Sequence, residues 1–410
     1  MPRKAADPIR FAGIGVASGL GHGRAAFREG LFAGRNVFSE LKREGREAPE
    51  GEQPFLGVEM PEPPAVLPPR VDRTATLTGR VAASVLAEAW EDAGLDAIAP
   101  ERIGLVVGGS NLATRERALA LVEYWEKRAF VRPRHGHMFL DTDLCGLCTA
   151  AFPIRGFAMT VGGASASGAV AIVEARNAIR SGRVDACIAL GAMQDLGGHD
   201  LQALRALGAM GSDRFSDVPE KACRPMDADH DGFLYGEAAA ALVLCRESVG
   251  LSKTYGTLLG AASIADGTRG PEPNHEGQIR AARMALAEAG LAAADIDHVN
   301  GHATGTPSGD DTELETYRAL GLHHTRINAT KSILGHGLAA AGAIETAAVL
   351  VQMAEGRLHP TRNLETPIDP GFKWVGVAPV EQKIGHALKF SFGFGGVNAA
   401  LVIGAPEASR

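Results

Sequence analysis

The segment Gly162-Gly163-Ala164-Ser165-Ala166-Ser167-Gly168 overlaps the start of a predicted helix at 166–180, where apolar side chains recur at helical spacing. A short apolar run at 185–190 follows and predicts a buried strand. Strands that alternate with helices through glycine-rich turns are typical of an α/β protein. At such a turn, free backbone N–H groups and the positive end of the helix dipole favour an oxyanion. Ser165 is therefore a candidate site residue, although close packing alone would also explain the small residues around it.

This alternation of strands and helices occurs twice along the chain. In the first half, strands are predicted at 11–16 and 103–107, and a helix at 75–93 follows a Pro- and Glu-rich surface segment at 42–71. An apolar run at 237–245 closes this half. After residue 252 the pattern restarts, with strands predicted at 256–264, 298–300 and 399–403 and helices at 278–289 and after Asp310. The sequence therefore predicts a duplicated topology, with halves at 1–250 and 251–410.

The composition is that of a globular protein and excludes two classes. The 410 residues carry a formal net charge of −7, and 45% are hydrophobic and 22% charged, which excludes intrinsic disorder. No long basic run is present, so nucleic acid is not expected as a partner.

The chain is expected to stay in the cytoplasm, away from membranes. Asp7 and Pro8 precede any sustained apolar run, so no secretory signal can be read. Residues 338–354 include Glu345 and Gln352, fall short of the roughly 20 apolar residues of a membrane span, and predict a buried helix. Five cysteines suit a reducing compartment, and the C-x-x-C pair at 145–148 is expected to be structural, with no metal, because no second Cys/His pair follows.

Two histidines stand in glycine-rich turns rather than on apolar faces. His302 follows Gly301, and His336 follows Gly335 five positions after Lys331. One such histidine is usually structural, but two of them are better explained as imidazole donors around a shared anionic site. A zinc site is the weaker interpretation, because neither H-E-x-x-H nor a third ligand is present.

Four blocks resemble, in order, motifs of the β-ketoacyl-acyl carrier protein synthase family of thiolase-fold condensing enzymes. Residues 224–237 are similar to that family's R-P-F-D…D-G-F…G-E, residues 300–310 to N-A-H-G-T-x-T-P-x-G-D, residues 330–336 to T-K-S-x-x-G-H, and residues 392–398 to F-G-F-G-G-T-N. The resemblance implies a thiolase-like fold, in which two βαβαβαββ halves stack as five layers, α-β-α-β-α. It also implies a homodimer, in which the strand at 185–190 pairs across the two-fold axis.

The resemblance also assigns roles to individual residues. His302 and His336 would be the two catalytic histidines, and Lys331 would pair with Glu345 and orient His336. Phe394 would supply a gate and a backbone oxyanion donor. Phe392 would contribute to the same gate and oxyanion region, and supporting positions in these motifs are Glu345, Thr304, Thr306 and Gly395. The resemblance implies no bound cofactor, because a phosphopantetheine arm delivered by the carrier protein would enter a tunnel to these residues.

One departure from the family's pattern lies at the nucleophile. The family has cysteine in a segment like S-T-A-C-x-S-G, where this chain has Ser165. A thiol has a pKa near 8.5 and a serine hydroxyl lies closer to water at ~15.7, a gap of roughly 7 pKa units. Acylation of Ser165 should therefore be badly impaired. Decarboxylation of a malonyl thioester needs no nucleophile, only donors that stabilise the enolate.

Three functions fit this pattern. The preferred prediction is a decarboxylase that converts malonyl-carrier protein to acetyl-carrier protein and resembles the serine-containing ketosynthase-like proteins of polyketide β-branching cassettes. The second is an elongating β-ketoacyl synthase in which an engineered serine replaces the cysteine, although Gly162-Gly163 favours natural divergence there. The third is a partner subunit like a chain length factor, but such proteins typically lack the histidines that this chain keeps.

Overall fold

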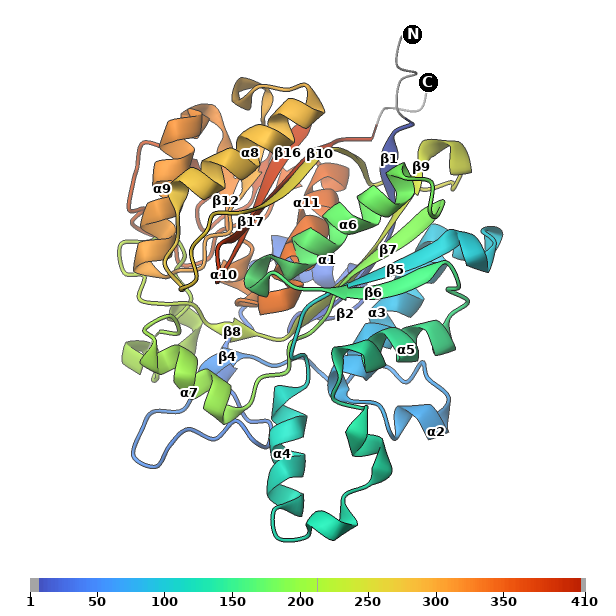
Figure 1. The fold of residues 1–410 in the computed structure, drawn as a ribbon. Coiled ribbons are helices and arrows are strands. Elements are labelled where there is room, and N and C mark those ends of the chain that lie inside the picture. The colour runs from blue at the N-terminus through green and yellow to red at the C-terminus, as the bar shows by residue number, and fades with distance from the viewer. Residues whose placement is uncertain (1–6, 212, 407–410) are drawn as a thin grey trace.

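The computed structural model describes residues 7–211 and 213–406 and divides them into two similar halves (Figure 1). The first half contains, in order, β1 (Ile9–Ser18), α3 (Leu77–Ala93), β5 (Ile103–Gly108), α5 (Asp141–Ala151), β6 (Phe157–Val161), α6 (Ser167–Arg180), β7 (Ala186–Gly191) and β9 (Ala238–Arg246). The second contains β10 (Gly256–Ala265), α8 (His275–Ala289), β11 (His298–Asn300), α9 (Pro307–Leu320), β12 (Arg326–Asn328), α11 (Ala341–Glu355), β16 (His386–Gly393) and β17 (Val397–Gly404). Both halves therefore follow the expected order βαβαβαββ.

Shorter helices and strands lie between these main elements. They are β2 (Gly21–His22), α1 (Arg24–Phe32), β3 (Ser39–Glu40), β4 (Leu56–Val58), α2 (Pro69–Asp72), α4 (Thr114–Tyr124), α7 (Gly198–Ala206), β8 (Tyr235–Gly236), α10 (Lys331–Leu334), β13 (Arg357–Leu358), β14 (Lys373–Trp374) and β15 (Val380–Glu381). Most of them lie in the first half, between the strands that the duplication predicts.

The main strands form five layers together with the helices. The strand order is β6-β5-β7-β9-β1 in the first half and β10-β17-β16-β11-β12-β14 in the second. The two sheets meet where β1 pairs with β10 at Arg10↔Thr257 and Phe11↔Gly256. Helices α6 and α11 pack between the sheets, α3 and α5 cover the first sheet, and α8 and α9 cover the second (Figure 1). The α-β-α-β-α arrangement predicted from the resemblance is confirmed.

The central layer depends on small residues. A Cβ on Gly168 of α6 would lie 2.6 Å from the backbone nitrogen of Ala343, and one on Gly342 of α11 would lie 2.3 Å from that of Ala169. Glycine at both positions therefore lets the two helices touch along their backbones. Residues Leu338–Glu355 are long and apolar enough to span a membrane, but 83% of this window is buried inside the protein, as expected for a core helix.

Two local predictions are corrected. The segment at 42–71 is not only a surface excursion, because β4 pairs with β3 and β8 and buries Leu56 and Val58. The apolar stretch that forms β4 is short, and the many Pro and Glu residues around it favoured the prediction of a surface segment. Helix α9 begins at Pro307, before Asp310, because proline is well tolerated in the first turn of a helix.

The predicted two-fold pairing of residues 185–190 is wrong. These residues form β7, which pairs with β5 on one side and with β9 on the other. Both edges of β7 are occupied, so it has no free ladder for a second copy. At this end of the sheet the outermost strand is β6, which pairs with β5.

Candidate active site

Four glycine-rich segments come together where the two halves meet. Residues 162–168 connect β6 to α6, residues 300–307 follow β11, residues 330–336 follow β12 and contain α10, and residues 392–398 form the turn from β16 to β17. The two halves touch closely at Gly393, because a Cβ there would lie 2.1 Å from the carbonyl oxygen of Gly163. The end of β16 is thereby held against the turn that carries Ser165.

Ser165 lies in a sharp turn. Residues Ala164–Ala166 form one turn of 3-10 helix directly before α6. Ala164 has φ +46°, in the left-handed region that non-glycine residues rarely adopt. Such backbone strain persists only where surrounding contacts impose it, and it is typical of functional sites. The turn leaves Ser165 half-buried, with its side chain directed at His336.

His336 holds one hydrogen-bond partner on each ring nitrogen. Its Nε2 lies 2.8 Å from Oγ of Ser165, and its Nδ1 accepts the backbone N–H of Leu338 at 3.3 Å. Burial, followed by the nearby lysines, lowers the pKa of His336 well below 6.5, so the ring is neutral. A neutral ring that accepts at Nδ1 carries its hydrogen on Nε2. His336 therefore donates to Ser165 and does not withdraw its proton.

His302 has the same neutral state. Its ring centroid lies 5.5 Å from that of His336, with the ring planes at 82°. Burial, followed by the charge of Lys331, lowers the pKa of His302 well below 6.5. Nδ1 of His302 lies 3.3 Å from Nζ of Lys331, which can only donate while it is charged. The hydrogen of His302 therefore also lies on Nε2.

Lys331 and Glu345 form the predicted pair. Nζ of Lys331 lies 2.5 Å from Oε1 of Glu345 and donates to the carbonyl oxygen of His302 at 2.5 Å. Both side chains are about 2% exposed. The contacts of Lys331 are with His302 rather than with His336, so the lysine orients the other histidine from the one that the sequence suggested.

Aromatic rings enclose the two imidazoles. Phe392 packs edge-on against His302 with a centroid distance of 5.5 Å, and Phe233 packs edge-on against His336 at 5.1 Å. Phe392 and Phe233 are both buried. Phe394 is 43% exposed and lies at the surface, in the turn that also holds Gly395. The structure thus places Phe392 beside the imidazoles and Phe394 outside the packed core.

The two threonines lie on the turn that follows His302. Oγ1 of Thr304 lies 2.9 Å from Oγ1 of Thr306, and both side chains are half-buried. Asp310 fixes this turn, since its carboxylate accepts the backbone N–H of Gly305 at 3.1 Å and that of Met226 at 2.6 Å. Asp310 therefore ties the block at 224–237, which contains Met226, to the histidine turn.

Sequence reasoning missed two buried charged residues at the site. Glu313 accepts the backbone N–H groups of His302 at 2.7 Å and Ala303 at 2.6 Å, and burial raises its pKa to about 7. Lys389 lies in β16 with Nζ 2.8 Å from Oε2 of Glu345. A signal existed for Lys389, because it is the one charged residue in the apolar run at 387–392.

None of the cysteines offers a reactive thiol. All five are buried, and burial raises the pKa of Cys145 and Cys245 to about 11 and that of Cys148 and Cys223 to about 12. Cys223 lies nearest to the site, with Sγ 3.2 Å from the carbonyl oxygen of Lys331. Within 7–211 and 213–406, no group of three or more His, Cys, Asp or Glu side chains is placed to hold a metal.

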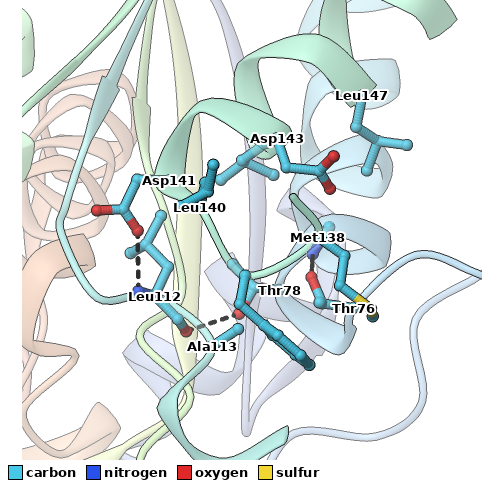
Figure 2. A pocket seen from close by; sticks show the side chains of 12 residues that line it. Thr76, Thr78, Leu112, Ala113, Met138, Leu140, Asp141, Asp143 and Leu147 are labelled. Carbon is cyan, nitrogen blue, oxygen red and sulfur yellow. Dashed lines mark hydrogen bonds between the residues drawn. The ribbon is translucent and has the colours of Figure 1, made fainter. Parts of the chain in front are cut away.

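A small cavity lies elsewhere in the first half, between α3 and the start of α5 (Figure 2). It is lined by Thr76, Thr78, Leu112 and Asp141, among others, and has a volume of about 20 Å³. That volume suits about one water molecule. The cavity is too small for a substrate and contains none of the candidate site residues.

Comparison with known proteins agrees with this geometry. Models of the beta-ketoacyl synthase N-terminal and C-terminal domains match residues 6–249 and 255–365. The polyketide biosynthesis malonyl-ACP decarboxylase PksF of Bacillus subtilis is 46% identical over 400 residues, which cover 96% of either chain. The 3-oxoacyl-acyl-carrier-protein synthase 2 of Coxiella burnetii is 30% identical over 417 residues, which cover 96% of this chain and 98% of that protein.

A solved structure gives the same result. The crystal structure of a beta-ketoacyl synthase from Burkholderia phymatum superposes with a TM-score of 0.86 at 26% identity, covering 97% of this chain and 99% of that chain. The fold, the domain matches and the relatives all span most of the chain. The chain therefore belongs to the beta-ketoacyl synthase family.

Proposed function

We propose that this chain decarboxylates a malonyl thioester on an acyl carrier protein and releases the acetyl thioester. The observation that carries the proposal is the state of the two imidazoles. His302 and His336 are buried and neutral, their ring centroids lie 5.5 Å apart, and each is bonded through Nδ1 so that Nε2 carries the hydrogen. Two such N–H groups can bind one developing oxyanion.

The chemistry needs no covalent step on the protein. The bond between Cα of the malonyl group and its free carboxylate breaks, CO₂ leaves, and the electron pair forms the enolate of the thioester. The Nε2–H groups of His302 and His336 donate to the enolate oxygen, and each preorganised donor of this kind is worth ~2.7–4 kcal/mol. A solvent proton then adds to Cα and completes the acetyl group.

Ser165 takes no covalent part in this proposal. Its hydroxyl lies 2.8 Å from His336, which is close enough for a general base. The hydrogen already on Nε2 prevents His336 from accepting the serine proton, and Lys331 occupies Nδ1 of His302. Ser165 is therefore an acceptor that holds the Nε2–H of His336 in place until the thioester oxygen replaces it.

The substrate assignment draws on the similar protein. PksF is named as a malonyl-ACP decarboxylase of polyketide biosynthesis, and it is similar along almost the whole chain. We extend that substrate to this chain, in the setting of polyketide β-branching. The carrier protein's phosphopantetheine arm would pass Thr304 and Thr306, whose hydroxyls can bind its amides, while Phe394 and Gly395 would supply the gate and a backbone donor.

The condensing alternative has one observation in its favour, the placement of Ser165 where a nucleophile would stand. Condensation requires an acyl group on that residue, and neither neighbouring histidine is in the tautomer that would deprotonate it. The non-catalytic alternative, like a chain length factor, leaves the donor pair His302 and His336 without a purpose. Decarboxylation uses both histidines and requires nothing from Ser165.

The proposal includes a homodimer that acts in the cytoplasm. Strand β6, with the sequence Phe-Ala-Met-Thr-Val, is the outermost strand of the first sheet, and its residues are partly exposed. An apolar edge strand presents backbone N–H and C=O groups that can pair with the same strand of a second copy. We therefore assign the two-fold pairing to β6 in place of β7.

Product analysis tests the proposal. Purified protein is incubated with malonyl-loaded carrier protein, and the carrier protein is weighed by intact mass spectrometry. Loss of one CO₂ without any condensation product supports decarboxylation. An unchanged malonyl group would favour the non-catalytic partner, and a ketoacyl product would favour a condensing synthase.

A further inference from the structure

Lys389 is a buried lysine that the proposed mechanism does not yet use. It lies in β16, between Leu388 and Phe390, and its side chain is fully buried. Burying an ammonium group costs free energy unless oxygen atoms replace its water shell. A lysine in this position therefore needs partners, and the structure supplies them.

Three oxygen atoms surround the Lys389 ammonium group. Nζ lies 2.8 Å from Oε2 of Glu345, donates to the carbonyl oxygen of Phe390 at 2.6 Å, and donates to Oγ of Ser391. Glu345 thus has one lysine on each carboxylate oxygen, since Lys331 lies 2.5 Å from Oε1. The three side chains form a continuous Lys331–Glu345–Lys389 bridge.

The bridge carries a net charge of +1, because two ammonium groups share one carboxylate. Glu345 alone would neutralise Lys331, and Lys389 restores the positive charge. That charge acts on both imidazoles, because burial is the largest influence that lowers the pKa of His302 and of His336, and Lys331 and Lys389 lower both further. The two groups that donate to the enolate are therefore next to a net positive charge.

We propose that Lys389 is a positioning residue for decarboxylation, which holds Glu345 and keeps the charge behind His302 and His336 positive. This inference rests on the proposed function. Lys389 is paired with Oε2 of Glu345, which leaves Oε1 of Glu345 paired with Lys331. The other hydrogens of the Lys331 ammonium group then point at the carbonyl oxygen and Nδ1 of His302. The negative enolate then forms against a fixed positive charge in a water-poor site, where such charges act strongly.

The charge on Lys389 depends on pH. The charged groups around it are Glu345 on α11, Lys331 on α10 and Glu313 on α9. Burial is the largest influence and lowers the pKa of Lys389 to about 8, while Glu345 opposes that shift. Lys389 is therefore charged below about pH 8 and loses its charge above it. A role in catalysis requires kcat to fall over the same range.

Lys389→Met tests the role, with Lys373→Met as the matched control, because Lys373 is an exposed lysine on β14 of the same sheet. We expect Lys389→Met to lower kcat roughly 100-fold, the size of effect that a misplaced catalytic group produces. KM for malonyl-carrier protein should not change, because Lys389 does not reach the substrate. Lys373→Met should match the wild type in both.

A double variant separates charge from packing. Lys389→Met leaves the bridge neutral, whereas Lys389→Met with Glu345→Gln restores a net charge of +1. The double variant should therefore be more active than Lys389→Met, although it lacks one more native contact. A purely structural role for Lys389 predicts the opposite order, because two packing defects would add.

The wild-type pH profile supplies a test that requires no variant. We expect kcat to fall above about pH 8 and this fall to be missing in Lys389→Met. A wild-type kcat that stays constant to about pH 10 would overturn the inference, as would a Lys389→Met variant with wild-type kcat. If the wild type itself fails to decarboxylate malonyl-carrier protein, the proposed function fails instead.

Discussion

Oγ of Ser165 accepts its hydrogen bond from Nε2 of His336, 2.8 Å away, because Nδ1 of that ring is occupied by the backbone N–H of Leu338. In an activated serine the direction is reversed, and the imidazole takes the hydroxyl proton. Ser165 and His336 thus have the spacing of a nucleophile and its general base, but His336 is not in the tautomer that could accept the hydroxyl proton. At this site the relationship favours decarboxylation over acyl transfer to Ser165.

The first prediction concerns Ser165. Ser165→Ala removes one hydrogen-bond acceptor, which costs about 1 kcal/mol, or roughly fivefold in rate. We expect the variant to keep substantial decarboxylation, measured by the initial rate of acetyl-carrier protein formation. Ser181→Ala is the control, because that hydroxyl lies at the far end of α6 and bonds the carbonyl oxygen of Ala178. Complete inactivity of Ser165→Ala alone would make the serine a nucleophile.

Ser165→Cys is expected to gain a reaction. A thiol ionises far more readily than a hydroxyl, and the Nε2–H of His336 would stabilise the thiolate by hydrogen bonding. The variant should therefore acylate itself from an acyl-carrier protein, and peptide mass spectrometry should find the adduct on residue 165. Absence of any adduct would show that the site does not align a thioester with this side chain.

The histidines provide a further prediction. His302→Ala and His336→Ala each remove one enolate donor, so each should lower kcat by roughly 100- to 1,000-fold. His324→Ala, an exposed histidine beyond α9, serves as the control and should keep wild-type kcat. Near wild-type rates in both site variants would contradict the enolate mechanism.

Glu313 provides a prediction on stability. Burial raises its pKa from 4.5 to about 7, so the folded protein holds this proton more tightly than the unfolded chain does. The contribution of Glu313 to the free energy of unfolding is thus complete below about pH 4.5 and is lost as the pH rises through 7. Glu313→Gln does not ionise, so its stability relative to the wild type should rise across that window.

Denaturant unfolding at a series of pH values measures this difference. Glu315→Gln is the matched control, because Glu315 is exposed on the same helix. We also expect Glu313→Gln to lower kcat, since the amide cannot accept from both His302 and Ala303 as the carboxylate does. A stability difference that does not vary between pH 4.5 and 7 would mean that Glu313 is ionised in the folded protein at low pH.

The dimer prediction concerns β6. Light scattering at micromolar concentration should give a mass twice the 42.7 kDa of the chain. In a strand, alternate residues direct their N–H groups to opposite neighbours, so proline at Ala158 or Met159 removes a donor from the free edge in one case and from the β5 ladder in the other. One variant should be a folded monomer and the other should be destabilised. A monomeric wild type would remove the claim.

The sequence predicted the elements with strong local signals. Strand β11 at His298–Asn300 agrees to the residue, and α3 and α6 agree to within two residues at each end. Glycine-rich turns mark the ends of these elements and also carry the site residues. Ser165, His302 and His336 therefore meet in space, because the same turns that end the strands hold these side chains.

Features that depend on neighbours in space could not be predicted in this way. The apolar run of β7 predicts burial but does not say which strands flank it, so the two-fold pairing implied by the resemblance was placed on the wrong strand. The tautomer of His336 depends on the N–H of Leu338, whose φ of +47° is not evident from its neighbours. The contact of Lys389 with Glu345 joins β16 to α11, and no periodicity relates them.

The most direct test of decarboxylation without acyl transfer is a single turnover with enzyme and malonyl-carrier protein at equal concentration, followed by intact mass measurement of both proteins. We expect the carrier protein to lose one CO₂ and keep its acetyl group, while the enzyme's own mass does not change at any time. An acyl adduct that appears on the enzyme at Ser165 and decays as product forms would contradict this expectation.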